Sequence, residues 1–286
     1  MSAQSSYVHP EALVSTDWLS QHLQAPDVRV VDASWYLPQE GRDAHIEYEL
    51  GHIPGAVFFD IDEISDTGNP LPHMLPSAEK FTSRVRKMGL GDGNRIVIYD
   101  GGLMAPAARV WWMFRLFGHD DVAVLDGGMG KWRQEDRPLE DLPPVPRERH
   151  FTARLNSTLV RDFDHMQRLV AKNSEQVLDA RSQGRFEGTA PEPREGLRSG
   201  HMPGSLNLPF VDILDAGQTM LPAAELGQAF ARAGVDLHKP VTTTCGSGVT
   251  AALLALGLHL LGHRQVAVYD GSWSEWASRD DTPIEP

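Results

Sequence analysis

The sequence predicts an α/β protein of two tandem domains, each built on a mostly parallel sheet with helices on both faces. The first observation behind this prediction is the length of 286 residues, which exceeds one ordinary domain and fits two. The second is the alternation of short runs rich in β-branched residues with helical patterns, which is typical of parallel sheets with crossover helices.

An internal repeat is the third observation. Four segments of the first half return in the same order in the second half: VVDAS at 30–34 as VLDAR at 177–181, GHIPGAVFFDI at 51–61 as GHMPGSLNLPF at 200–210, RIVIYD at 95–100 as PVTTTC at 240–245, and VAVLDGGMGKW at 122–132 as VAVYDGSWSEW at 266–276. A period this long indicates two copies of a whole domain rather than a solenoid of small units.

The predicted domain boundaries follow from the repeat. We expect an N-terminal domain over 8–135, a linker over 136–157 and a C-terminal domain over 158–286. The linker is rich in proline, with Pro138, Pro143, Pro144 and Pro146. Together with its charged residues, this composition is typical of an extended connection.

The elements of the second half can be predicted in order. Four short runs are expected to be strands: QVLDA, SLNLP, PVTTT and VAVYD. Helical patterns cover 223–235 and 250–262, and the second is apolar almost all round, which predicts a buried helix. Ligand sites of such sheets lie beyond the carboxyl ends of the strands, and Cys245 directly follows PVTTT.

Cys245 is the only cysteine of the chain, and it lies in a loop between a predicted strand and a predicted helix. Gly246 and Gly248 allow positive φ and leave backbone N–H groups uncovered, so these groups can surround the sulfur as an anion-binding nest. The helix N-terminus adds partial positive charge. Both effects favour a thiolate. The alternative is a buried structural cysteine.

The loop sequence separates the reactions that a thiolate could perform. Phosphate-ester cleavage needs an arginine six positions after the cysteine, and that position is Ala251. Acyl transfer needs a histidine base and stays open. Sulfur transfer needs a thiolate that becomes a persulfide and donors that stabilise it, which the loop offers. The repeat aligns Asp100 with Cys245, so the first half cannot perform thiol chemistry.

Composition excludes several other classes of protein. The net charge of −13 and the absence of a basic stripe argue against nucleic-acid binding. No apolar run approaches the roughly 20 residues of a membrane span. The N-terminus lacks the features of a secretory signal and of a mitochondrial presequence, and one cysteine cannot form an intramolecular disulfide. We therefore expect a cytoplasmic protein without membrane or nucleic-acid partners.

No metal or organic cofactor is expected. The segment HIEYELGH lacks the spacing of a zinc-binding HExxH motif, and LDGGMG does not begin a GxGxxG helix.

Six motifs together resemble those of the tandem-domain sulfurtransferases of the rhodanese superfamily. They are CGSGVT, GHMPGSLN, DARSQGRFEG, EPREG, HIPGA and YDGSWSEW, and the resemblance covers nearly the whole chain. The loop CGSGVT is similar to that of the mercaptopyruvate branch, whereas the thiosulfate branch typically carries basic residues there. Thiosulfate is a dianion that favours nearby cations, whereas a mercaptopyruvate carboxylate can be held further from the sulfur.

The resemblance implies a role for each matched residue. Cys245 would be the nucleophile, and Arg185 and Arg194 would hold the carboxylate and carbonyl of the substrate, which suits a guanidinium fork. The alternative is that these arginines pair on the surface with a nearby carboxylate, namely Glu187, Glu192 or Glu195. Ser247, His73 and Asp62 would form a proton relay. Gly246, Gly248, Val249 and Thr250 would present loop N–H groups to the persulfide.

The implied reaction moves the sulfur of 3-mercaptopyruvate to Cys245 as a persulfide and releases pyruvate. The acceptor must then come from outside the chain, as a small thiol, thioredoxin or cyanide, and reduction of the persulfide would give hydrogen sulfide. Two alternatives stay open. One is a thiosulfate:cyanide sulfurtransferase, and the other is a non-catalytic rhodanese-like binding module.

Overall fold

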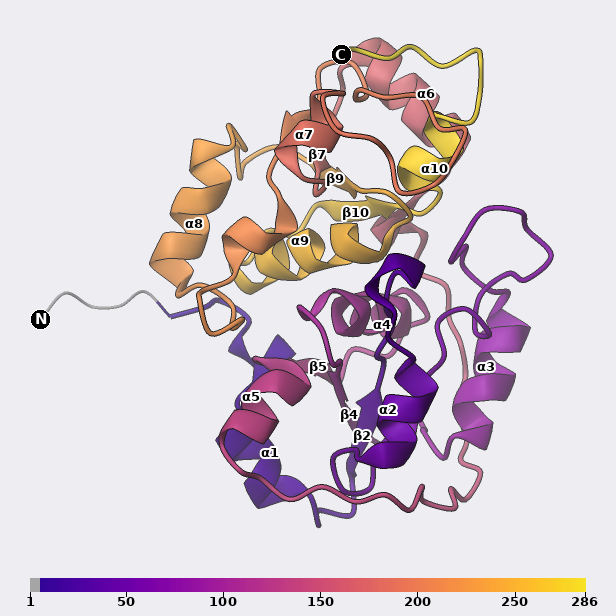
Figure 1. Cartoon of the computed structure of the whole chain (residues 1–286), viewed down its shortest axis with the longest axis vertical. Coiled ribbons are helices and arrows are strands. Elements are labelled where there is room, and N and C mark those ends of the chain that lie inside the picture. The colour runs from indigo at the N-terminus through magenta and orange to yellow at the C-terminus, as the bar shows by residue number, and fades with distance from the viewer. Residues whose placement is uncertain (1–5) are drawn as a thin grey trace, which may run out of the picture.

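The computed structural model describes residues 6–286 and consists of two α/β domains stacked one above the other (Figure 1). The first sheet has the order β1-β5-β4-β2-β3 and the strands β1 Leu13–Val14, β2 Val28–Asp32, β3 Val57–Phe58, β4 Arg95–Tyr99 and β5 Val122–Leu125. The second has the order β6-β10-β9-β7-β8 and the strands β6 Val160–Arg161, β7 Gln176–Asp179, β8 Leu206–Asn207, β9 Val241–Thr244 and β10 Val266–Tyr269. Neighbouring strands in both sheets are parallel, and the matching orders confirm the predicted fold class.

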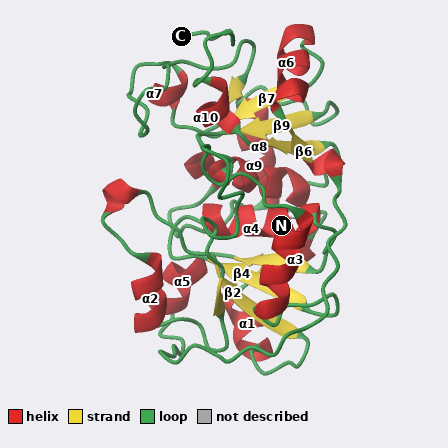
Figure 2. Ribbon diagram, turned by 90° about the vertical axis from the view of Figure 1, so that its right-hand side faces the viewer, coloured by secondary structure: helices red, strands yellow, loops and turns green. Residues whose placement is uncertain are grey.

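Helices cover both faces of each sheet (Figure 2). The first domain contains α1 Thr16–His22, α2 Ala44–Leu50, α3 Ala78–Lys87, α4 Ala105–Leu116 and α5 Gly128–Gln134. The second contains α6 Phe163–Lys172, α7 Gln183–Phe186, α8 Ala223–Arg232, α9 Val249–Leu260 and α10 Ser272–Trp276. Short 3₁₀ turns lie at Pro10–Ala12, Pro38–Glu40, Ser157–Leu159 and Phe210–Ile213.

The helices predicted over 223–235 and 250–262 are present as α8 and α9, and both end two or three residues earlier than expected. Gly234 and Gly262 follow their C-termini with φ of +84° and +82°. Glycine adopts this left-handed conformation without a Cβ clash, so it ends a helix readily.

The two domains share one apolar core. α4 and α9 pack against each other between the two sheets (Figure 2), and in α9 only Thr250 and His259 are not buried. The core cluster is continuous from the first domain through these helices into the second. The prediction of a buried helix here is confirmed. The apolar surface of α9 is covered by α4 of the first domain as well as by the sheet of its own domain.

The segment between the domains is extended and runs along the first domain (Figure 1). It forms an isolated bridge between Glu140 and His52, buries Phe151, and bonds the Arg154 N–H to the Phe117 carbonyl at 2.8 Å. The limits of 136 and 157 for the linker stay a prediction. No helix among residues 6–286 has the length and apolar character needed to span a lipid bilayer.

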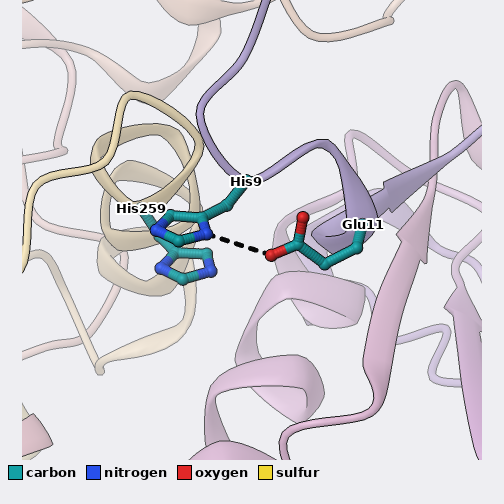
Figure 3. Close-up of side chains that lie close together, drawn as sticks. All are labelled: His9, Glu11 and His259. Carbon is teal, nitrogen blue, oxygen red and sulfur yellow. Dashed lines mark hydrogen bonds and ion pairs between the residues drawn. The ribbon is translucent and has the colours of Figure 1, made fainter.

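The N-terminal segment ties the first domain to the second. The Val8 N–H donates to the Leu260 carbonyl at 2.8 Å, and the His9 ring stacks on His259 of α9 with ring centroids 4.5 Å apart (Figure 3). His9 Nδ1 lies 3.0 Å from Glu11 Oε1. Because the two rings are 3° from parallel, their nitrogen lone pairs do not converge on one point, as shared metal coordination requires. The cluster is therefore a packing contact in this arrangement.

The stacked histidine predicts a pH-dependent stability. Burial, followed by the charges of Arg115 and His9, lowers the pKa of His259 to about 3. An unfolded histidine titrates near about 6.5, so the unfolded chain binds more protons between these two values. We expect the free energy of unfolding to fall by about 1 kcal/mol per pH unit below pH 6.5 through this residue. Urea unfolding at pH 5 and pH 7 should show a smaller difference in His259→Gln than in the parent. An equal difference in both proteins would contradict the assignment, and His165→Gln on the exposed face of α6 is the control.

Candidate active site

Cys245 lies at the carboxyl edge of the second sheet, between β9 and α9, as predicted. Its Sγ accepts a hydrogen bond from the Gly248 N–H at 3.1 Å, and its side chain is 2% exposed. Val249 and Thr250 form the first turn of α9, where backbone N–H groups have no acceptor within the helix. The sulfur therefore lies in a loop that donates at least one N–H to it, next to the positive end of a helix.

Helix α10, which follows the next strand β10, holds the Cys245 loop in place through hydrogen bonds. In α10, the Ser272 hydroxyl accepts from the Cys245 N–H at 3.2 Å, and the Trp273 N–H donates to the Cys245 carbonyl at 2.9 Å. The N–H and the hydroxyl of Ser274 both donate to the Gly246 carbonyl, at 2.9 and 2.7 Å. These four bonds occupy outward-facing groups of the loop and hold its shape.

The two glycines of the loop are required for different reasons. Gly248 has φ of +78°, which fits the expectation of positive φ. Gly246 does not adopt the positive φ that a glycine allows. A Cβ at Gly246 would lie 3.0 Å from Arg185 Nη2 and 3.8 Å from Arg194 Nη1. Gly246 therefore makes room for guanidinium groups.

The equivalent loop of the first domain is already filled by a carboxylate. Asp100 Oδ1 accepts the N–H groups of Gly102 and Met104 at 2.7 and 3.2 Å, and Oδ2 accepts that of Ala107 at 2.9 Å. Burial raises the pKa of Asp100 to about 6, against the lowering effect of these three donors. A loop of this shape thus binds an anionic group through backbone N–H groups, and the first domain supplies that group itself.

The two arginines predicted to bind substrate both lie at the Cys245 loop, and their surroundings differ. Arg185 donates to Glu192 through Nη2 at 2.6 Å and Nε at 3.3 Å. Glu192 was one of the surface partners considered from the sequence, yet its side chain is only 3% exposed and also accepts from Arg181 at 2.8 Å. This carboxylate therefore orients Arg185 inside the site. Its position in EPREG, two residues before Arg194, was the available signal.

Arg194 has no hydrogen-bonded protein acceptor within residues 6–286. The pKa of Arg194 is lowered, and burial is the largest cause. The charge of Cys245 has the next largest effect and raises the pKa. Arg185 lowers it further, and Glu192 and Asp62 raise it. These neighbours come from both domains. The guanidinium thus lies beside the Cys245 loop, near Gly246, with its donors free, which suits it to an anionic ligand.

His73 and Asp62 of the first domain lie together, as the predicted relay requires. His73 Nδ1 is 2.9 Å from Asp62 Oδ1, and the His73 side chain is 3% exposed. The Trp35 indole N–H donates to Asp62 Oδ2 at 2.8 Å, and its ring packs edge-on against His73 with centroids 4.7 Å apart. Burial alone would raise the pKa of Asp62, but His73, Trp35 and Arg194 hold it below its ordinary value. Sequence reasoning missed Trp35, which directly follows VVDAS.

The third member of the predicted relay, Ser247, is not bonded to the His73–Asp62 pair. Ser247 is 7% exposed in the Cys245 loop, and its hydroxyl makes no hydrogen bond to another residue in the described part of the chain. Neither ring nitrogen of His73 has a hydrogen-bond partner there, although Nδ1 lies 2.9 Å from Asp62 Oδ1. The structure thus brings His73 to Asp62, while a direct contact between Ser247 and His73 stays a prediction.

The fold and this site define a tandem-domain protein of the rhodanese class. The family model described as Rhodanese-like domain matches residues 15–135 and 162–279. The chain belongs to the rhodanese family, which confirms the resemblance noted from its motifs.

Named relatives are similar over nearly the whole chain. A human 3-mercaptopyruvate sulfurtransferase is 45% identical over 275 residues, covering 94% of this chain and 92% of the relative. A thiosulfate sulfurtransferase of Gallus gallus is 45% identical over 274 residues, covering 94% of each chain. The crystal structure of SseA from Escherichia coli, a 3-mercaptopyruvate sulfotransferase, superposes with a TM-score of 0.84 at 39% identity, covering 92% of this chain and 98% of that one. Sulfur transfer is the activity that the two named relatives share.

Adding a methyl group at Gly246 should weaken substrate binding without unfolding the protein. The backbone there has no positive φ, but the new Cβ would meet Arg185 Nη2 at 3.0 Å and displace it by a few tenths of an ångström. We expect Gly246→Ala to raise KM for the sulfur donor by about 10-fold, because binding by a guanidinium fork depends on exact placement. Gly227→Ala in α8, where the Cβ would meet nothing within 4 Å, is the control. An unchanged KM in Gly246→Ala would contradict this role of the glycine.

Proposed function

We propose that the protein is a sulfurtransferase that moves the sulfur of 3-mercaptopyruvate to an external acceptor through a persulfide on Cys245. The observation that carries the proposal is the single thiol bonded to the Gly248 N–H, in a loop against which the guanidinium groups of Arg185 and Arg194 lie at Gly246. The name of the human relative supports the choice of donor.

The arginines orient the donor in this proposal. The free donors of Arg194 bind the carboxylate, and Arg185, held by Glu192, binds the neighbouring carbonyl oxygen. A 2-oxo acid bound in this way directs its third carbon, and the sulfur on it, toward Cys245. Both arginines are partly buried, which limits the competition of bulk water for their guanidinium groups.

The first half-reaction transfers one sulfur atom. The Cys245 thiolate attacks the donor sulfur, a bond forms between the two sulfur atoms, and the bond between the donor sulfur and carbon breaks. The electron pair of that bond stays on the carbon as the enolate of pyruvate. The proton of the donor thiol ends on this carbon, so the products are pyruvate and an anionic persulfide. His73, oriented by Asp62, and Ser247 move this proton.

The persulfide is stabilised by the loop. We expect the Gly248 N–H, which bonds to Cys245 Sγ, and the first-turn amides of α9 to stabilise the negative charge of the outer sulfur. The equivalent loop of the first domain supports this role of the amides, because its backbone N–H groups bind the carboxylate of Asp100.

The second half-reaction uses an acceptor from outside, since the chain contains no other cysteine. The acceptor attacks the outer sulfur and Cys245 leaves as a thiolate. A small thiol, thioredoxin or cyanide can do this, and a second thiol that reduces the resulting persulfide releases hydrogen sulfide. These steps require no metal or organic cofactor. A reducing cytoplasmic setting suits the lone thiol.

Thiosulfate is the second candidate donor, favoured by the name of the Gallus gallus relative. The loop residues Ser247, Val249 and Thr250 are neutral, so the loop adds no positive charge to that of the two arginines for binding a dianion. We expect kcat/KM for mercaptopyruvate to exceed that for thiosulfate by about 10-fold or more, with cyanide as the acceptor for both donors. A preference for thiosulfate would replace the proposed donor, and no transfer from either would overturn the proposed function.

A further inference from the structure

A buried ion pair joins the two domains directly behind the Cys245 loop. Arg109 of α4 is 1% exposed, and its Nη2 donates to Asp270 Oδ1 at 2.7 Å. Asp270 follows β10, and its Oδ2 accepts the N–H of Leu75 in the first domain at 2.8 Å. The carboxylate of one domain is thus bonded to a side chain and a backbone group of the other.

The same guanidinium binds the backbone of both halves of the site. Arg109 Nη2 donates to the His73 carbonyl at 2.6 Å, and Nη1 donates to the Gly248 carbonyl at 3.3 Å. His73 belongs to the proposed relay in the first domain, and Gly248 donates its N–H to the Cys245 sulfur in the second. One planar group therefore connects the two loops through adjacent atoms.

The backbone of both loops adopts unusual conformations at these contacts. His73 has φ of +59°, a left-handed conformation that costs a non-glycine residue about 1–2 kcal/mol. The bond from Arg109 to its carbonyl stabilises that conformation. At Gly248, a Cβ would lie 2.9 Å from Arg109 Nη1 and 2.8 Å from the Asp270 carbonyl, so any side chain there would push the arginine away.

We propose that Arg109 and Asp270 are positioning residues that hold His73 against the Cys245 loop across the domain interface. A buried ion pair adds little stability compared with apolar residues of the same volume, so its value here lies in its geometry. Neither residue is hydrogen-bonded to Arg185 or Arg194 in the described chain. The pair therefore acts on proton transfer and not on donor binding. This inference rests on the role of His73 in the proposed function.

Arg109→Lys tests the inference, because an ammonium group keeps the charge but lacks the planar fork that reaches these acceptors. We expect the single-turnover rate of pyruvate release at saturating mercaptopyruvate to fall about 30-fold, since small misplacements of catalytic groups have effects of this size. KM should stay within about twofold. Tyr7→Phe removes another hydrogen bond between the domains, from the Tyr7 hydroxyl to the Leu221 carbonyl, and should leave the rate unchanged.

A double-mutant comparison separates positioning from a merely structural effect. If Arg109 acts through His73, adding Arg109→Lys to His73→Gln should reduce the rate by no more than about threefold further. A full additional loss of about 30-fold would overturn the inference while leaving the proposed function intact. If His73→Gln alone is as fast as the parent, the role of His73 in the proposed function is wrong and the inference falls with it.

Asp270→Asn changes the ion-pair partner of Arg109 without changing the shape of its side chain. It is the alternative test if Arg109→Lys does not fold. Its amide oxygen can still accept one bond, from Leu75 or from Arg109, so the same loss of rate and the same dependence on His73 are expected. If Asp270→Asn reduces the rate of the His73→Gln protein by as much as it reduces the rate of the parent, the inference is overturned in the same way.

Discussion

Cys245→Ser is expected to abolish sulfur transfer, with a rate at least about 1,000-fold below that of the parent. A serine hydroxyl stays protonated at neutral pH and cannot hold a transferred sulfur atom as a persulfide. The substitution is nearly isosteric, and the hydroxyl can still accept from the Gly248 N–H, so the loop should keep its shape. The measurement is the release of pyruvate from mercaptopyruvate with a thiol acceptor present.

The control for this variant is its folding. Far-ultraviolet circular dichroism and the midpoint of thermal unfolding should stay close to the parent, because one sulfur atom is exchanged for one oxygen at a 2% exposed position. If a folded Cys245→Ser protein releases pyruvate as fast as the parent, the chemistry takes place elsewhere in the molecule.

Arg194→Met is expected to lower kcat/KM for mercaptopyruvate by about 100-fold, the second largest effect among these variants. The guanidinium of Arg194 has no protein acceptor in the described chain, so its donors are available to a carboxylate. Methionine keeps much of the apolar stem and removes only the charged fork. Most of the loss should appear in KM, because Arg194 binds a part of the donor that does not change charge in the reaction.

Arg168→Met provides a matched control on the exposed face of α6, where the same change of side chain should leave KM unaltered. Glu192→Gln is a graded comparison. It leaves Arg185 without its buried anionic partner, whereas Arg181 keeps its ion pair with Asp179, so a smaller rise in KM is expected than for Arg194→Met. An unchanged KM in Arg194→Met would show that the carboxylate is held by another group.

The fold was predictable because the chain repeats. Each half contains the same sequence of β-rich runs, and parallel strands separated by helices leave few arrangements. The place of Cys245 followed from its neighbours alone, since the end of a strand and the start of an apolar helix surround it. The positions of the helix ends were predicted less accurately. Gly234 and Gly262 end α8 and α9 through backbone conformations that the spacing of apolar residues does not reveal.

The supporting contacts of the site were less predictable. Glu192 was visible as one of several carboxylates, and its position in EPREG was the one sequence signal, which does not reveal that the carboxylate is buried against Arg185. Trp35 contacts His73 only because a loop of the first domain folds back over 38 residues. Arg109 and Asp270 are 161 residues apart, so their pairing depends on how the domains dock. Such contacts depend on tertiary packing.

The most direct test of the central claim is mass spectrometry of the intact protein after brief incubation with mercaptopyruvate and no acceptor. The account predicts a mass gain of one sulfur atom, carried by the peptide that contains Cys245 and lost again when a thiol is added. The Cys245→Ser protein should gain nothing. If pyruvate is released at the full rate in a first turnover while Cys245 stays unmodified, the sulfur does not pass through this thiol and the account is contradicted.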